Sequence, residues 1–129
     1  MPRRASSHPT QAELEVLNVL WRQGPATVRQ VHEALQADRQ TSLTTTLKIL
    51  QVMTDKGLVT PSDTRPHVYT ATTPQAKTQA GLLADLVHRA FDGSLGQLVL
   101  RAVEDDRLSG GELAEIQQAI TTLRKRKRG

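Results

Sequence analysis

The sequence predicts a mainly α-helical protein. We expect a winged helix-turn-helix of three helices and a β-hairpin wing over residues 10–73, followed by a three-helix dimerisation region over residues 74–123. Two observations predict this fold class. Apolar residues recur at helical spacing in six segments, and two β-prone runs separated by a turn-rich loop follow the third segment. Two consecutive helices followed by a hairpin are the element order of a winged helix-turn-helix.

Two capping boxes place the first two helices. Thr10 with Glu13 opens a helix that runs through residue 22, and Thr27 with Gln30 opens the next one. A Gly-Pro pair at positions 24 and 25 separates the two helices. The inward stripe of the second helix includes His32, which we interpret as a packing histidine because it has no neighbouring ligand types.

The third helix carries the candidate DNA-binding surface. On a 3.6-residue period counted from Thr44, one face is apolar and the opposite face is polar and free of acids until Asp55. Hydroxyls, an amide and an ammonium group can donate to phosphate oxygens or reach base edges. An ordinary solvated polar face is the alternative. The apolar face holds Thr46, Ile49, Leu50 and Met53, and the polar face holds Thr44, Thr45, Lys48 and Gln51.

The wing is predicted directly after this helix. Gly57 suits a left-handed helix C-cap, residues 58–60 and 68–70 are β-prone, and residues 61–66 are rich in turn formers. Arg65 at the tip and His67 on the returning strand are placed to meet the phosphate backbone or the minor groove. Asp55 and Lys56, between the helix face and the wing, are interpreted as solvated charges.

Charge separates the two halves of the chain. The 129 residues have a net charge of +4 and a pI near 10.0, which favours anionic partners. Residues 73–123 carry only four Lys or Arg against seven Asp or Glu, so this segment is not a polyanion-binding surface. The ends of the chain are basic: we expect a flexible arm over residues 1–9, and a basic tail over residues 124–129 that complements a helix dipole or adds nonspecific DNA affinity.

The segment 74–123 is predicted to dimerise. Thr73 and Pro74 open one helix, a second follows Gly93, and a capping box of Ser109 with Glu112 opens a third. Three short amphipathic helices bury little surface by themselves, which favours pairing with a second copy. The alternative is that they pack on their own winged domain. The candidate interface residues are Leu82, Leu83, Leu86, Val87, Phe91, Leu98, Val99, Leu113, Ile116 and Ile120.

Several classes of function are not supported. The chain has no cysteine, and its four histidines are scattered, so we predict no metal site, no cofactor and no enzymatic activity. No apolar run approaches the roughly 20 residues that span a bilayer, so we expect a cytoplasmic protein. A winged-helix module that binds protein, without sequence-specific DNA binding, remains the alternative function.

The segments ELEVLNVLWRQGPATVRQVHEAL, the pair Thr44 and Thr45, KGLV and VYTA resemble the BlaI/MecI/CopY family of penicillinase-type repressors. GSLGQLVLRAV and LSGGELAEI resemble that family's dimerisation region. The resemblance implies a homodimeric repressor that binds double-stranded operator DNA with an inverted repeat. It also implies, for several members, relief by cleavage that depends on a membrane metalloprotease sensor.

Carried over by position, the resemblance assigns DNA contacts to the four polar-face residues and to the wing pair of Arg65 and His67. It aligns the cleavage bond, commonly Asn-Phe in the family, with Arg101 and Ala102. Family members often have Arg where this chain has Val52. The copper-responsive branch uses C-terminal cysteines, which this chain does not contain.

Overall fold

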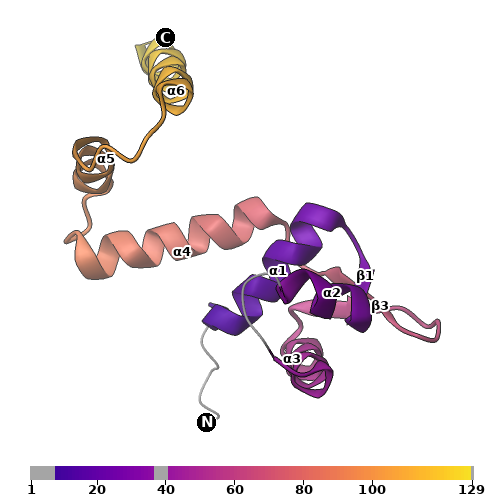
Figure 1. Ribbon diagram of the computed structural model, residues 1–129. Helices are drawn as coiled ribbons and strands as arrows, with labels where there is room; N and C mark the ends of the chain where they lie inside the picture. Colours follow the sequence, from indigo (N-terminus) through magenta and orange to yellow (C-terminus); the bar gives the residue numbers. More distant parts are fainter. Residues whose placement is uncertain (1–7, 37–40, 129) are drawn as a thin grey trace. The chain divides into compact units, whose positions relative to one another are not determined.

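The computed structural model describes residues 8–36 and 41–128, and Figure 1 shows its helices and strands. Within these residues it contains six helices and a small antiparallel sheet, which confirms the predicted fold class. The predicted arm, apart from His8 and Pro9, lies outside the described residues, as does most of the turn predicted before the third helix. His8 and Pro9 are half-buried.

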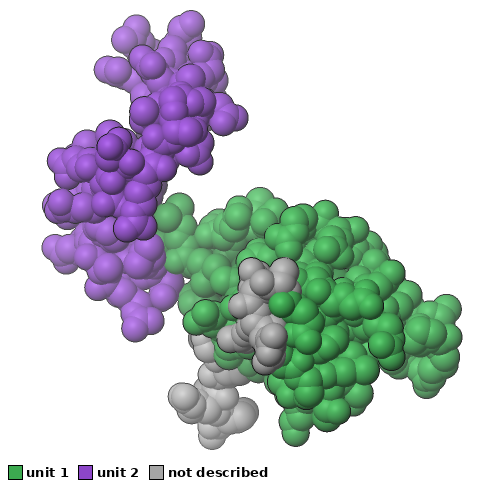
Figure 2. Space-filling model, in the orientation of Figure 1, with its two compact units in different colours: residues 1–83 green, residues 84–129 purple. Residues whose placement is uncertain are grey.

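The chain divides into two compact units, residues 1–83 and residues 84–129, which Figure 2 colours separately. The first unit contains α1 (Gln11–Gln23), α2 (Val28–Leu35), α3 (Leu43–Lys56) and the sheet. α4 (Gln75–Ala90) belongs partly to each unit, and α5 (Leu95–Glu104) and α6 (Gly110–Arg128) belong to the second. We describe each unit by itself.

Both predicted capping boxes at the start of the chain are present. The Thr10 backbone N–H donates to the Glu13 carboxylate at 2.9 Å, and the Glu13 N–H donates to the Thr10 hydroxyl at 3.1 Å. Thr27 and Gln30 exchange the equivalent pair of bonds at 2.9 and 3.2 Å. Each box satisfies two backbone N–H donors that a helix start would leave without a partner.

α3 has the predicted two-faced character. Its N-cap is Ser42, whose hydroxyl accepts from the Thr45 N–H at 3.1 Å, so the helix starts before Thr44. Leu50 and Met53 are fully buried, whereas the polar face is exposed. The helix ends at Gly57 in the left-handed conformation (φ 81°, ψ 16°), as predicted.

The sheet has three strands rather than the predicted two. β2 (Val59–Pro61) and β3 (Val68–Ala71) form the predicted hairpin, with Thr60 opposite Thr70. β1 (Ala26–Thr27) adds to the other side of β3, giving the order β1-β3-β2. A strand of two residues is too short to show an alternating pattern, which is why the sequence did not reveal it.

The core of the first unit joins α1, α2, α3 and the sheet. It is made of aliphatic side chains with a single aromatic ring, that of Tyr69, and Val16, Val31 and Leu50 are fully buried within it. The indole N–H of Trp21 donates to the Thr73 carbonyl oxygen at 3.1 Å. This bond fixes the chain where it leaves the sheet and enters α4.

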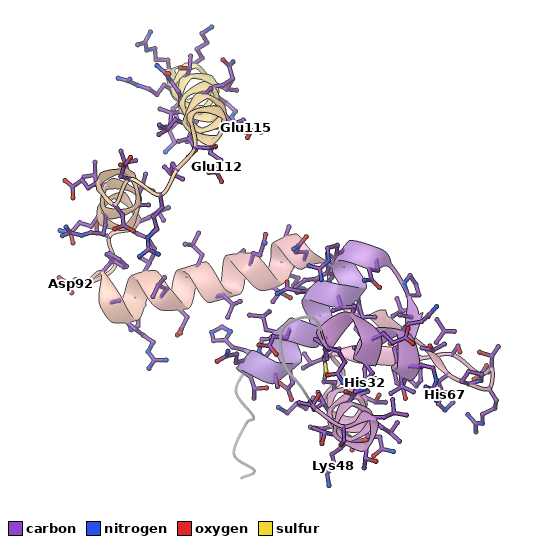
Figure 3. All side chains as sticks on the ribbon, in the orientation of Figure 1. His32, Lys48, His67, Asp92, Glu112 and Glu115 are labelled. Atoms are coloured by element: carbon purple, nitrogen blue, oxygen red, sulfur yellow. The ribbon has the colours of Figure 1, made fainter. Side chains whose placement is uncertain are left out.

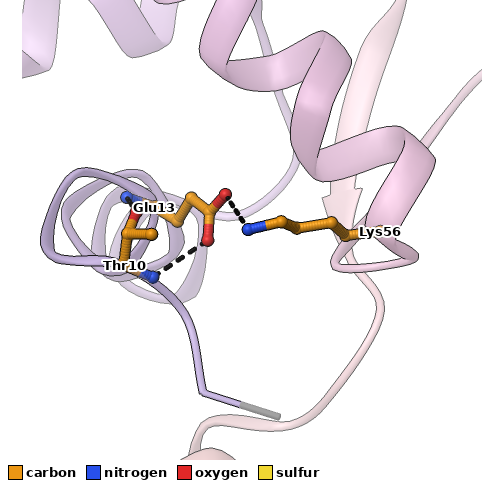
Figure 4. A network of polar contacts seen from close by, with 3 residues as sticks. All are labelled: Thr10, Glu13 and Lys56. Carbon is orange, nitrogen blue, oxygen red and sulfur yellow. Dashed lines mark hydrogen bonds and ion pairs between the residues drawn. The ribbon is translucent and has the colours of Figure 1, made fainter. Parts of the chain in front are cut away.

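An ion pair links the start of α1 to the end of α3. Lys56 Nζ lies 2.8 Å from a carboxylate oxygen of Glu13, which is 4% exposed (Figure 4). Lys56 is exposed, as interpreted, but it also pairs with Glu13, which was not predicted from the sequence. Burial raises the pKa of Glu13, but hydrogen bonds from Lys56 and Thr10 and the charge of Lys56 together hold that pKa below its ordinary value.

The helices of the C-terminal region bury little. No residue of α4, α5 or α6 is buried among the residues that the structure describes. Ser109 and Glu112 make the predicted capping box, with bonds of 2.9 and 3.0 Å. α6 continues to Arg128, so residues 124–128 of the predicted basic tail are helical: Lys and Arg are good helix formers, and cations are favoured at a helix C-terminus. No described helix is long and apolar enough to cross a membrane.

Candidate nucleic-acid interface

α3 presents one polar surface to solvent. Thr44, Thr45, Lys48 and Gln51 are all exposed, and we call these four residues the reading face. Figure 3 shows the Lys48 side chain extending away from the body of the first unit. No Asp or Glu lies on α3 before Asp55, so most of the reading face offers donors without a nearby carboxylate on the same helix.

The start of α3 fixes one of these side chains. The hydroxyls of Thr45 and Ser42 lie 2.9 Å apart, and Ser42 also caps the helix through the Thr45 N–H. A hydroxyl has one donor and two acceptor positions, so Thr45 keeps hydrogen-bonding capacity toward solvent. The N-terminal end of α3 also carries the positive end of the helix dipole, which favours phosphate nearby.

A polar network holds α2 and α3 in their helix-turn-helix arrangement. His32 Nδ1 lies 3.0 Å from the Thr46 hydroxyl, and Thr46 is completely buried. On its other side His32 Nε2 lies 3.2 Å from the Gln36 amide nitrogen. Gln36 in turn bonds both the N–H and the carbonyl of Thr41, each at 3.2 Å. His32 is half-buried and packs between the two helices, as predicted.

The proton of His32 can be assigned from this network. The Gln36 amide nitrogen only donates, so His32 Nε2 accepts and Nδ1 carries the proton. Nδ1 then donates to the Thr46 hydroxyl, which donates to the Ser42 carbonyl at 3.4 Å. Because Ser42 caps α3, the chain of bonds runs from α2 to the start of the helix that carries the reading face.

The wing places Arg65 beside His67. His67 Nδ1 lies 2.7 Å from the Ser62 carbonyl oxygen, and Arg65 Nη1 lies 2.6 Å from Nε2 of the same ring. Because a carbonyl only accepts, Nδ1 carries the proton and Nε2 accepts from Arg65. The imidazole ring also meets Tyr69 edge-on, with centroids 6.1 Å apart. The ring therefore orients the exposed guanidinium of Arg65 at the tip of the wing.

A groove separates α3 from the wing. It has a volume of about 240 Å³ and brings Gln51 of the reading face together with His67 of the wing. Thr44, Thr45, Lys48 and Arg65 do not line it. Among the residues that line this groove, Asp55 carries a negative charge. The lining residues are Leu47, Gln51, Thr54, Asp55, Pro61, His67 and Tyr69.

Two apolar side chains on α3 are exposed, and neither was included among the candidate contact residues predicted from the sequence. Leu47 and Val52 are each 37% exposed, and Leu47 lies in the groove one turn before Gln51. An apolar side chain within a polar reading surface can contact the methyl group of thymine. The spacing of Leu47 between Thr44 and Gln51 could have placed it beside the polar face, but Leu47 was assigned to neither face from the sequence.

The remaining predicted residues lie in the C-terminal region. Leu83, Leu86, Val99, Leu113 and Ile120 are exposed, by 38–48%. Arg101 and Ala102 are exposed on α5, and Arg101 pairs with Glu104 at 3.3 Å. No three His, Asp or Glu side chains of the described residues lie close enough together to hold a metal ion. The half-buried candidates are Leu82, Val87, Phe91, Leu98 and Ile116.

Comparison with known proteins identifies the family of this chain. Residues 9–122 match the family model described as penicillinase repressor. The chain is 37% identical over 114 residues to the transcriptional regulator BlaI of Mycobacterium tuberculosis, covering 86% of this chain and 81% of that protein. It is 28% identical over 120 residues to the penicillinase repressor of Bacillus licheniformis, covering 92% and 94%. It is 22% identical over 112 residues to the methicillin resistance regulatory protein MecI of Staphylococcus aureus, covering 86% and 91%. The chain therefore belongs to the penicillinase repressor family of transcriptional regulators.

Proposed function

We propose that this protein is a homodimeric transcriptional repressor that binds an inverted-repeat operator through the reading face and the wing. The observation that carries the proposal is the exposed surface of α3, which presents two hydroxyls, an ammonium group and an amide with no acid before Asp55. The membership of the penicillinase repressor family supports a regulatory role on DNA.

Each group of this surface has a separate chemical role in the proposal. Thr45 donates to or accepts from base edges in the major groove, and Lys48 neutralises phosphate or donates to guanine. Arg65, oriented by His67, meets the backbone or the minor groove beside the helix. Leu47 favours thymine through its exposed methyl groups.

Dimerisation is proposed because α4, α5 and α6 leave their apolar stripes uncovered. Leu86 is 48% exposed and Leu100 is 63% exposed, and none of the three helices buries a residue. Small units of this size commonly need a partner to bury enough apolar surface. Two copies would place two reading faces on one side of DNA, roughly 34 Å or a multiple of it apart.

Relief of repression is proposed to follow cleavage between Arg101 and Ala102 by a membrane metalloprotease sensor. The bond lies within α5, so cutting it would remove α6 from the rest of the dimerisation surface. A repressor reduced to one half-site would lose tight operator binding. Immunoblotting through induction tests this: a fragment ending near Arg101 supports cleavage, and an intact chain on a derepressed promoter contradicts it.

The DNA proposal is tested on fragments of the region flanking the protein's own gene, beginning with a footprint. Thr45→Ala should cost about 1–3 kcal/mol on the protected sequence and relax base preference there. Lys48→Ala should weaken binding to all DNA and lower the log-log salt slope by about 0.9. Lys77→Ala, at an exposed lysine of α4, is the matched control and should change neither the DNA affinity nor the salt slope.

The same titration separates DNA binding from the alternative of a protein-interaction module. A module that docks protein through α3 would show no footprint on DNA. In that case Lys48→Ala would leave the salt dependence of any residual DNA binding unchanged. Unchanged operator affinity in a folded Thr45→Ala, Lys48→Ala double variant would also refute the assignment of the reading face.

The dimer is tested by sedimentation of the full chain at micromolar concentration. Leu86→Asp places a carboxylate on the uncovered stripe of α4 and should shift the protein to a monomer. Gln79→Asp, at an exposed polar position of the same helix, adds the same charge and should leave the dimer intact. A monomeric wild-type chain would contradict the proposal.

A further inference from the structure

α6 ends in a run of five cations that the family comparison does not cover. The family match stops at residue 122, and Arg124, Lys125, Arg126, Lys127 and Arg128 follow it. All five are exposed and helical, and the structure shows no ion pair for any of them among the residues it describes. Like charges at i, i+4 oppose each other on a helix, so this end carries uncompensated repulsion.

Three of these cations share one face with a hydroxyl. Thr121, Arg124, Lys125 and Arg128 line a shallow hollow of about 210 Å³, and we call these four residues the α6 cationic face. Their sequence spacing of three and four residues places them side by side on a helix. Figure 3 shows nitrogen-tipped side chains around the end of α6.

The α6 cationic face is separate from the apolar stripe of the same helix. Leu113, Ile116, Ile120 and Leu123 follow each other at steps of three and four residues, which makes one continuous stripe. At about 100° per residue, the centre of the cationic face lies roughly 110° around the helix from the centre of this stripe. A second copy covering the stripe would therefore leave the cations accessible.

Other cations of this region already have partners. Arg89 pairs with Asp85 at 3.5 Å, Arg101 pairs with Glu104 at 3.3 Å, and Arg107 contacts Asp105. Within the described part of residues 84–129, the end of α6 is thus where positive charge is concentrated without a neighbouring carboxylate.

We propose that the α6 cationic face binds phosphate groups of duplex DNA next to the operator, as a sequence-independent second anchor. This inference rests on the proposed function, since the reading face must bring the protein to DNA. Guanidinium and ammonium groups around a shallow hollow suit the oxygens of a phosphodiester backbone. A membrane surface fits less well, because residues 124–128 contain no apolar side chain that could enter a bilayer.

The test compares salt titrations of the full chain on a duplex of arbitrary sequence, about 40 base pairs or four helical turns long. The triple variant Arg124→Gln, Lys125→Gln, Arg128→Gln should lower the log-log salt slope by about 2–3 and weaken binding at least about tenfold at low salt. Sedimentation should show the same oligomeric state as the wild type, because the apolar stripe is untouched.

The matched control removes three cations that are already paired. Arg89→Gln, Arg101→Gln, Arg107→Gln changes the net charge equally within the same region and should leave the salt slope unchanged. An equal loss in both triple variants would reduce the effect to net charge and overturn the proposal. A wild-type slope in the α6 variant would overturn it directly.

Two further comparisons distinguish this inference from the proposed function and from membrane binding. If Lys48→Ala leaves DNA binding unchanged while the α6 variant loses it, the reading face is refuted, and the α6 cationic face is itself the DNA contact rather than a second anchor. If instead Lys48→Ala weakens DNA binding and the α6 variant does not, the second anchor is refuted and the proposed function is retained. Loss of binding to anionic phospholipid vesicles, with DNA binding intact, would assign the α6 cationic face to membranes and refute the proposal.

Discussion

Replacing Lys56 by Met isolates the contribution of the long-range ion pair between Lys56 and Glu13. The methionine keeps the length and apolar stem of the side chain but removes the ammonium group that lies 2.8 Å from Glu13. Glu13 is 4% exposed and would keep its bond from the Thr10 N–H at 2.9 Å. A buried carboxylate would then have lost its charged partner.

The size of the effect follows from the exposure of each partner. Removing one member of a fully buried pair costs about 3–5 kcal/mol. The Lys56 side chain is 36% exposed, so water would reach part of the vacated site and reduce the penalty. We therefore expect Lys56→Met to lower the free energy of unfolding by about 1–3 kcal/mol at pH 7. Glu13→Gln with Lys56→Met should cost less than the sum of the two single changes.

Urea denaturation at fixed protomer concentration measures these differences, repeated from pH 7 down to pH 3. The folded-state pKa of Glu13 is lowered from 4.5, so the pair stabilises the protein above that value. Its contribution is lost as the pH falls through the lower folded-state pKa. The difference in the free energy of unfolding between wild type and Lys56→Met should therefore become smaller as the pH is lowered. A change below about 0.5 kcal/mol at pH 7, or a gap that is constant with pH, would refute the reasoning.

Three other changes probe the fold and the interface. Leu50→Ala should lower the free energy of unfolding by about 2–5 kcal/mol in the same urea assay, because Leu50 is fully buried and the helices around it cannot fully collapse. Gly57→Ala should cost about 1–2 kcal/mol there, since φ is 81° at this helix end although nothing lies within 4 Å of the added methyl group. Leu47→Ala should leave stability nearly unchanged and weaken operator binding only where thymine is present, as competition with uracil-substituted operator DNA would show; equal loss on both DNAs would contradict the methyl contact.

Local patterns in the sequence were sufficient to predict most of the first unit. The capping boxes at Thr10 and Thr27 and the left-handed Gly57 depend on residues within one turn of each other, and all three are present. The hairpin also followed from composition, since its two strands flank a loop of turn formers. The N-cap Ser42 was not predicted, because it lies outside the apolar periodicity from which this helix was predicted.

Contacts between distant segments could not be predicted in the same way. Glu13 and Lys56 are 43 residues apart, and each had a satisfactory local interpretation, as a capping residue and as a solvated charge. Trp21 meets Thr73 over 52 residues, and β1 joins the sheet through only two residues. None of these pairings leaves a periodic signal, because the partners are brought together by packing of the core.

Specific polar contacts that were not predicted hold the two ends of α3 in place. The network through His32 and Thr46 fixes the start of α3, and the Glu13–Lys56 pair fixes its end, while Leu50 and Met53 are buried between them. The reading face is thus supported at both ends of α3 and on its buried side by residues that are not themselves part of the reading face. The C-terminal helices, in contrast, bury no residue within one chain. If the proposed dimer forms, loss of the partner copy should therefore leave α3 correctly folded, and affinity for the proposed operator should fall because one half-site is lost rather than because the reading face is damaged.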